Sequence, residues 1–67
     1  MYPNLEAELA RVRMSKRQLA KKLGKAPATM SQKFAGKVGI DINEAFEIKK
    51  IIGCENVSID ELFAWKD

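Results

Sequence analysis

The chain has 67 residues, 46% of them hydrophobic and 31% charged, which suits one small folded domain and is too apolar for a disordered tail. No apolar run is long enough for a membrane helix or a signal-peptide core, so we expect a soluble, cytoplasmic protein with no membrane partner. One cysteine and no histidine exclude a disulfide framework and the usual zinc clusters. We therefore expect residues 1–67 to fold as one domain without metal or cofactor, stabilised by packing alone or by pairing with a second copy.

The charges are strongly segregated along the chain, although the net charge is only +3. Between Leu9 and Ile40 there are nine basic residues and no acidic one, whereas acids predominate on both sides of this stretch. Such a pattern predicts a surface of one sign and a polyanionic partner such as nucleic acid. The alternative reading is a solvated, lysine-rich helix face.

The first predicted helix runs from about residue 4 to residue 13. Asn4 is placed as its N-cap, and acidic side chains in the first turns suit the helix dipole. Its apolar stripe consists of Leu5, Leu9 and Val12.

Two further helices are predicted over residues 15–23 and 27–35. Ser15 and Gln18 form a capping box for the first of them, and Gly24 supplies a left-handed residue that ends it. Pro27 opens the second, and Gly36 ends it. The two helices are therefore joined by a very tight turn.

The last two predicted helices begin at Asp41 and Ser58, each with a glutamate three residues later that completes a capping box. Gly53 stops the fourth helix, whose apolar face is assigned to Ala45, Phe46, Ile48, Ile51 and Ile52. No segment alternates as a strand does, so the fold class is all-α, a compact bundle of five helices.

The unit that carries function is the pair of helices over about residues 15–36. Two helices joined by a glycine-ended turn cross steeply, so that the second can enter a major groove while the first lies across the DNA backbone. Gly24 is required at the turn because a Cβ there is strained. Ala20 must be small where the helices cross, and Met30 fills the space beneath.

A resemblance can be named on three stretches: "MSKRQLAKKLGKAPATMSQKFAGK", "INEAFEIKKIIG" and "SIDELF". Together they resemble the lambda repressor/Cro-type (XRE-like) helix-turn-helix family of phage and prophage transcriptional regulators, over roughly Leu5 to Phe63. The resemblance implies a five-helix bundle of lambda-repressor type that binds operator DNA, usually as a dimer. Lys25 and Lys33 depart from the family, since they stand at positions that are often apolar.

The resemblance also implies roles for individual residues. Lys16 falls where the family bonds a phosphate, Ala28 and Gln32 where it reads bases, and Thr29 where it often touches the backbone. Ala35 and Lys37 fall where the family contacts phosphates.

Side-chain chemistry supports part of this set and adds Lys33. Gln32 can pair bidentately with adenine, Ala28 can touch a thymine methyl, and Lys33 can reach a phosphate or a guanine. The expected base-reading residues are Ala28, Thr29, Gln32 and Lys33, and the expected phosphate contacts are Ser15, Lys16, Arg17, Lys25 and Lys37. Lys21 and Lys22 are expected to face solvent. Because the second helix of the pair carries few polar groups, phosphate contacts should supply most of the affinity.

Two other features have competing interpretations. The C-terminal residues Leu62, Phe63 and Trp65 either complete the core or form a self-association surface for a homodimer. Cys54 has no histidine with which to form a catalytic pair, and we expect it to be half-buried and structural.

No residue pattern indicates catalysis or a small-molecule substrate. The hypothesis is a double-stranded-DNA-binding regulator; the alternative is a protein-interaction module, an anti-repressor or adaptor, on the same scaffold.

Overall fold

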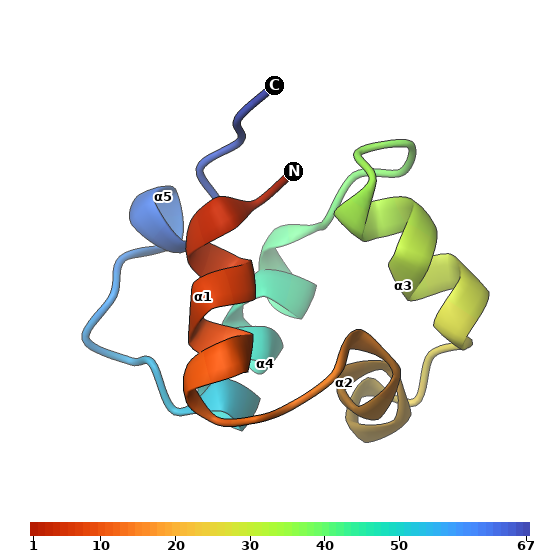
Figure 1. Cartoon of the computed structure of the whole chain (residues 1–67), viewed down its shortest axis with the longest axis horizontal. Helices are drawn as coiled ribbons and strands as arrows, with labels where there is room; N and C mark the ends of the chain where they lie inside the picture. The colour runs from red at the N-terminus through yellow and green to blue at the C-terminus, as the bar shows by residue number, and fades with distance from the viewer.

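Five helices joined by loops make up the computed structural model, which describes residues 1–67 (Figure 1). They are α1 (Pro3–Arg11), α2 (Lys16–Leu23), α3 (Pro27–Phe34), α4 (Ile42–Ile52) and α5 (Ile59–Leu62). The absence of strands confirms the all-α class, and the radius of gyration of 10.7 Å confirms a compact arrangement. None of the helices has the length and hydropathy that crossing a lipid bilayer requires.

Side-chain caps fix the beginnings of α2 and α4. The hydroxyl of Ser15 accepts from the Gln18 backbone N–H at 3.0 Å, and the Gln18 side chain accepts from the Ser15 N–H at 2.8 Å. Asp41 and Glu44 form the same reciprocal pair at the start of α4. Ser58 caps α5 through the Glu61 N–H, but the return bond from the Ser58 N–H is absent. The two full capping boxes are therefore confirmed, and the third is half formed.

The first helix differs from the sequence prediction at both ends. It begins at Pro3, and the Asn4 side chain donates to the Glu61 carbonyl at 2.7 Å, so Asn4 ties α1 to α5 and is not a cap. It ends at Arg11, because Arg13 adopts the left-handed conformation with φ of 55°. The Met14 N–H then bonds the Leu9 carbonyl at 2.9 Å, which closes the helix end.

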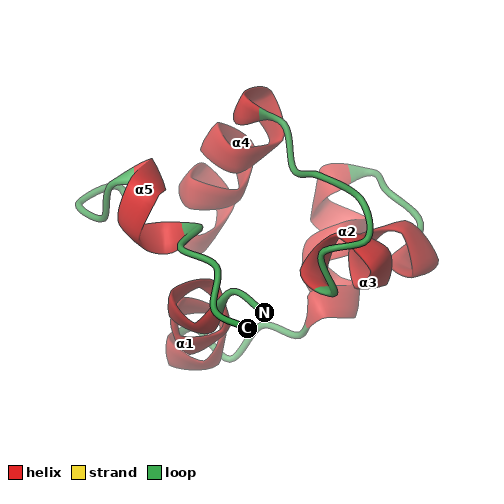
Figure 2. Ribbon diagram, turned by 90° about the horizontal axis from the view of Figure 1, so that it is seen from above, coloured by secondary structure: helices red, strands yellow, loops and turns green.

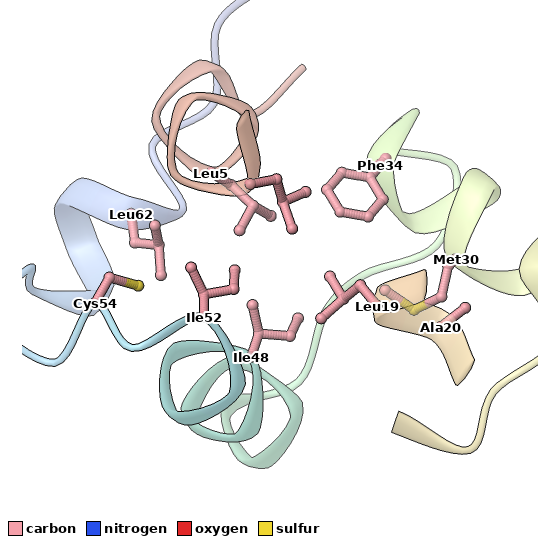
Figure 3. Packing of buried hydrophobic residues seen from close by; sticks show 10 residues of the cluster. Leu5, Leu19, Ala20, Met30, Phe34, Ile48, Ile52, Cys54 and Leu62 are labelled. Carbon is pink, nitrogen blue, oxygen red and sulfur yellow. The ribbon is translucent and has the colours of Figure 1, made fainter. Parts of the chain in front are cut away.

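The core brings together apolar side chains from all five helices (Figure 3). Leu5, Leu19 and Leu62 have no exposed surface, and Cys54 is only 4% exposed, so the cysteine is more deeply buried than expected. Phe46 is the main correction within α4: it was assigned to the apolar face but is 55% exposed, because the buried side of α4 is formed by Ala45, Ile48 and Ile52.

The two chain ends lie side by side (Figures 1 and 2). The Met1 ammonium donates to the Lys66 carbonyl, and the Lys66 N–H donates to the Met1 carbonyl, both at 2.9 Å. The tail also reaches the end of α3 through the side chain of Trp65, which packs over Gly36 so closely that a Cβ at Gly36 would lie 2.5 Å from the indole. In both views α2 and α3 lie together on one side of the molecule, opposite α1 and α5.

Candidate nucleic-acid interface

The turn between α2 and α3 has the geometry that its sequence predicts. Gly24 adopts φ of 72°, and the next N–H, that of Lys25, returns to the Ala20 carbonyl at 2.9 Å. Ala20 and Met30 are buried where the two helices pack together. The turn thus holds α3 against α2 and leaves the opposite side of α3 facing outward.

The outer face of α3 is uncovered. Ala28 and Gln32 are exposed and Thr29 is half-buried. A shallow hollow runs along this face, and it is lined by Ala28, Ser31, Gln32, Ala35 and Lys37. The lining contains no carboxylate, so an approaching polyanion meets no like charge there. Ser31 is a polar group on this face that sequence reasoning missed; its spacing of three from Ala28 is the signal that would have found it.

Lys33 does not lie on this outer face, which corrects its assignment as a base reader. It is only 8% exposed, and its ammonium forms an ion pair with Oε1 of Glu44, itself 8% exposed. The position three residues after Met30 places Lys33 on the buried side of α3, towards the beginning of α4. Its charge is therefore neutralised within the molecule and does not face a ligand.

Lys25 shares the same carboxylate. Its Nζ lies 3.8 Å from Oε2 of Glu44, an oxygen that has no hydrogen-bond partner of its own. Glu44 thus faces two lysines, Lys25 and Lys33, which stand at the two positions that are often apolar in the resembling family. The buried carboxylate explains how the buried Lys33 ammonium is accommodated, whereas Lys25 stays exposed, and it makes Glu44 more than a cap.

Two more of the expected phosphate ligands, Lys16 and Ser15, are engaged within the molecule, in addition to Lys25. Lys16 Nζ lies 3.5 Å from Glu6 Oε1 and 5.0 Å from the centre of the Phe34 ring. The Ser15 hydroxyl oxygen already accepts the capping bond, although its proton stays free to donate. Lys16 keeps 48% of its side chain exposed, so it stays accessible to a ligand despite this exposed ion pair.

Five cations, four of them without an acidic partner, gather on the solvent side of α2. One hollow there is lined by Arg17, Gln18, Lys21, Lys25 and Pro27, and a second by Val12, Arg13, Met14, Gln18, Lys21 and Lys22. The hollows share two residues, Gln18 and Lys21, so they form a continuous surface. We call its cations the α2 basic face: Arg13, Arg17, Lys21, Lys22 and Lys25. Only Lys25 among them has a carboxylate within 4 Å.

Lys21 and Lys22 are exposed, as expected, and the structure places them beside Arg17 and Arg13 in these hollows. Their position in the middle of α2, opposite Leu19 and Ala20, is the sequence signal for this placement. Lys37 is exposed at the other end of the interface, beside the hollow on α3. Cations therefore lie near both ends of α3, with Arg17 and Lys25 close to Pro27 and Lys37 after Phe34.

The C-terminal residues divide between the core and the surface. Leu62 has no exposed surface, so its assignment to a self-association surface is wrong. Phe63 is half-buried and meets Tyr2 edge to face at 5.9 Å between ring centres. Trp65 also contacts Tyr2, at 5.0 Å, and is 46% exposed. This segment mainly packs onto α1 and onto the end of α3.

Cys54 lies in the core, with its Sγ 3.9 Å from the Lys49 carbonyl oxygen. Burial, reinforced by the negative charge of Glu8, raises the pKa of the Cys54 thiol. The thiol is therefore protonated at neutral pH, a state that disfavours nucleophilic attack.

Comparisons of the chain with protein-family models, with curated proteins and with solved structures give no match.

Proposed function

We propose that this protein is a sequence-specific DNA-binding transcriptional regulator of the lambda repressor/Cro helix-turn-helix type, in which α3 lies in the major groove. The observation that carries the proposal is the uncovered outer face of α3, which has no carboxylate and has cations near both of its ends, Arg17 and Lys25 close to Pro27 and Lys37 after Phe34. A helix that presents small and amide side chains, with cations near both of its ends, fits a groove bordered by phosphates.

Within this arrangement, side chains divide into base readers and phosphate contacts. Gln32 is the best base reader, since its amide can pair with N6 and N7 of adenine. Ser31 adds a hydroxyl that can bond either kind of base pair, and Ala28 offers a methyl contact to thymine. Arg17, Lys21 and Lys37 bind phosphates. Most of the affinity is electrostatic, because the base-reading groups are few.

The first test is DNA binding measured by fluorescence anisotropy across a series of salt concentrations. If the α2 basic face and Lys37 neutralise four or five phosphates, the plot of log K against log salt has a slope of roughly −4. Lys21→Ala should make the slope shallower by about 1 for every DNA sequence. Lys66→Ala removes the same charge at the far end of the chain and should leave the slope unchanged.

The second test addresses sequence preference. Selection of bound molecules from a random DNA pool should give a preferred site, and Gln32→Ala should relax that preference by about 1–3 kcal/mol at one base pair without abolishing binding. Absence of salt-sensitive binding at micromolar protein would contradict the whole proposal.

The second candidate function is a protein-interaction module on the same scaffold, as in an anti-repressor or adaptor. The withdrawal of Lys33 into the ion pair with Glu44 favours it, because α3 then offers only three polar side chains at its outer face, Thr29, Ser31 and Gln32. A basic surface that binds DNA of every sequence equally, or not at all, would favour this candidate.

A further inference from the structure

The α3 helix ends in a glycine turn that an aromatic side chain from the C-terminal tail covers. Gly36 has φ of 80°, and the next N–H, that of Lys37, returns to the Gln32 carbonyl at 3.0 Å. A Cβ built at Gly36 would lie 2.5, 2.9 and 3.1 Å from three neighbouring atoms of the Trp65 indole. Any side chain at Gly36 would therefore displace the indole from the end of α3.

The end of α2 shows that such a turn does not need a cover. Gly24 has φ of 72°, and the Lys25 N–H returns to the Ala20 carbonyl at 2.9 Å, so α2 and α3 end with the same hydrogen-bond pattern. A Cβ at Gly24, however, would meet nothing within 4 Å. The indole over Gly36 is therefore an addition to the α3 end and not part of the turn itself.

Trp65 is also held on its other sides. Its ring meets the Tyr2 ring nearly at right angles, with 5.0 Å between the ring centres, and its Nε1–H donates to Asp67 Oδ1 at 2.9 Å. The following residue, Lys66, exchanges two backbone hydrogen bonds with Met1. The indole thus links the beginning of α1 and the tail to the end of α3.

The loop that follows Gly36 has few other restraints. The N–H groups of Val38, Gly39 and Ile40 donate no backbone hydrogen bond, and Val38 is 41% exposed. Ile40 packs against the core at the far end of the loop. Segments with few hydrogen bonds and few buried contacts open most easily, so the contact of Trp65 with Gly36 is well placed to hold the beginning of this loop.

We propose that Trp65 is a positioning residue for DNA binding, which keeps Lys37 beside the outer face of α3 by holding the backbone at Gly36. Lys37 lines the same hollow as Gln32, so its place decides whether a cation lies next to the base-reading face. A loop that is already ordered loses less conformational freedom when it binds. The role rests on the proposed function, because Lys37 acts through a phosphate.

Amide hydrogen exchange measured by NMR tests the hold on the loop without DNA. In Trp65→Ala the Lys37 N–H should exchange at least about tenfold faster than in the wild type. The Lys25 N–H closes α2 in the same way with no indole above it, so its rate should stay unchanged. Phe46→Ala removes another exposed aromatic ring, on α4, and should change neither rate. Unchanged exchange at Lys37, or an equal rise at both amides, would overturn the proposal.

Fluorescence anisotropy with a labelled DNA duplex tests the effect on binding. Lys37→Ala should weaken binding in the wild type, and its effect should be at least about threefold smaller in the Trp65→Ala background, because the two residues are coupled through one backbone segment. Lys21→Ala, on α2, is the matched control. It should weaken binding by the same factor in both backgrounds, since distant sites contribute additively.

The possible results separate the role of Trp65 from the proposed function. A wild type without salt-sensitive DNA binding contradicts the proposed function and, with it, the role of Trp65 in binding. DNA binding in which Lys37→Ala has the same effect with and without the indole contradicts the role of Trp65 alone.

Discussion

Lys33 of α3 and Glu44 of α4 form an ion pair at which both side chains are about nine-tenths withdrawn from solvent. The pair joins the helix assigned to the DNA groove to the beginning of the next helix. Buried ion pairs add little net stability compared with apolar residues of the same size, but removing one partner leaves an uncompensated buried charge. We therefore expect that replacing one partner alone lowers the stability strongly, whereas replacing both partners with uncharged residues lowers it much less.

Glu44→Gln should lower the free energy of unfolding by about 3 kcal/mol or more. Glutamine can still serve as the capping-box partner of Asp41, so the loss reports the missing charge opposite Lys33. Urea unfolding followed by circular dichroism measures it. Glu47→Gln, an exposed position on the same helix, is the control and should change stability by less than about 0.5 kcal/mol.

A double variant keeps this prediction testable if Glu44→Gln fails to fold. Lys33→Met in the Glu44→Gln background removes the unpaired ammonium and should restore much of the lost stability. Equal stability of Glu44→Gln and Glu47→Gln would show that an unpaired Lys33 ammonium does not destabilise the fold.

Gly36→Ala should destabilise the protein more than Gly24→Ala. Both glycines have positive φ, of 80° and 72°, so both substitutions cost about 1 kcal/mol of backbone strain. At Gly24 a Cβ meets nothing within 4 Å, whereas at Gly36 it would meet the ring of Trp65, which adds about 1–3 kcal/mol. Thermal and urea unfolding compare the two variants. In a Trp65→Ala background the difference between them should disappear; if it persists, the indole is not its cause.

Arg13→Gly should leave stability unchanged or raise it by up to about 1 kcal/mol, because glycine adopts the left-handed conformation without a steric cost. The same variant should weaken DNA binding and make its salt dependence shallower, since it removes one cation from the α2 basic face. Unfolding and anisotropy measured on the same preparation give both results. A loss of stability would show that the left-handed backbone of Arg13 carries no strain. Unchanged binding would show that Arg13 does not contact DNA.

Cys54 should react with a thiol reagent only as the protein unfolds. Its pKa is raised in the folded state, so the folded protein holds the thiol proton to higher pH than the unfolded chain does. The stability that this contributes is fully present below the ordinary thiol pKa and is lost as pH rises through the raised one. Urea unfolding at pH values below and above this pKa range should show that the free energy of unfolding falls more with pH in the wild type than in Cys54→Ala. Rapid labelling of the native protein at neutral pH would contradict the burial.

Local chemistry explains why much of the fold is predictable from the sequence. The capping boxes at Ser15 and Asp41 and the glycine stop at Gly24 each need only a few neighbouring residues, so the pattern and the structure agree there. Asn4 shows the limit of this reasoning. It is an acceptable cap by type, but a distant carbonyl, that of Glu61, binds its side chain instead.

The candidate site is harder to predict for the same reason. The spacing from Met30 indicates that Lys33 faces inward, but only the fold brings Glu44, eleven residues later, to meet it. Phe46 likewise has the large apolar side chain of a typical core residue, and only the packing of α4 shows that the core lies on the opposite side of the helix. Periodicity gives the faces of a helix, and tertiary contacts decide which face is covered.

The mutual hydrogen bonds between Met1 and Lys66 make the backbone almost a closed ring. A short peptide linker could join the ends head to tail with little disturbance of the fold, and new ends could then be opened in a surface loop such as residues 37–39. Because cyclisation restricts the unfolded chain and leaves the helices as they are, the circular form should melt at a higher temperature than the linear one.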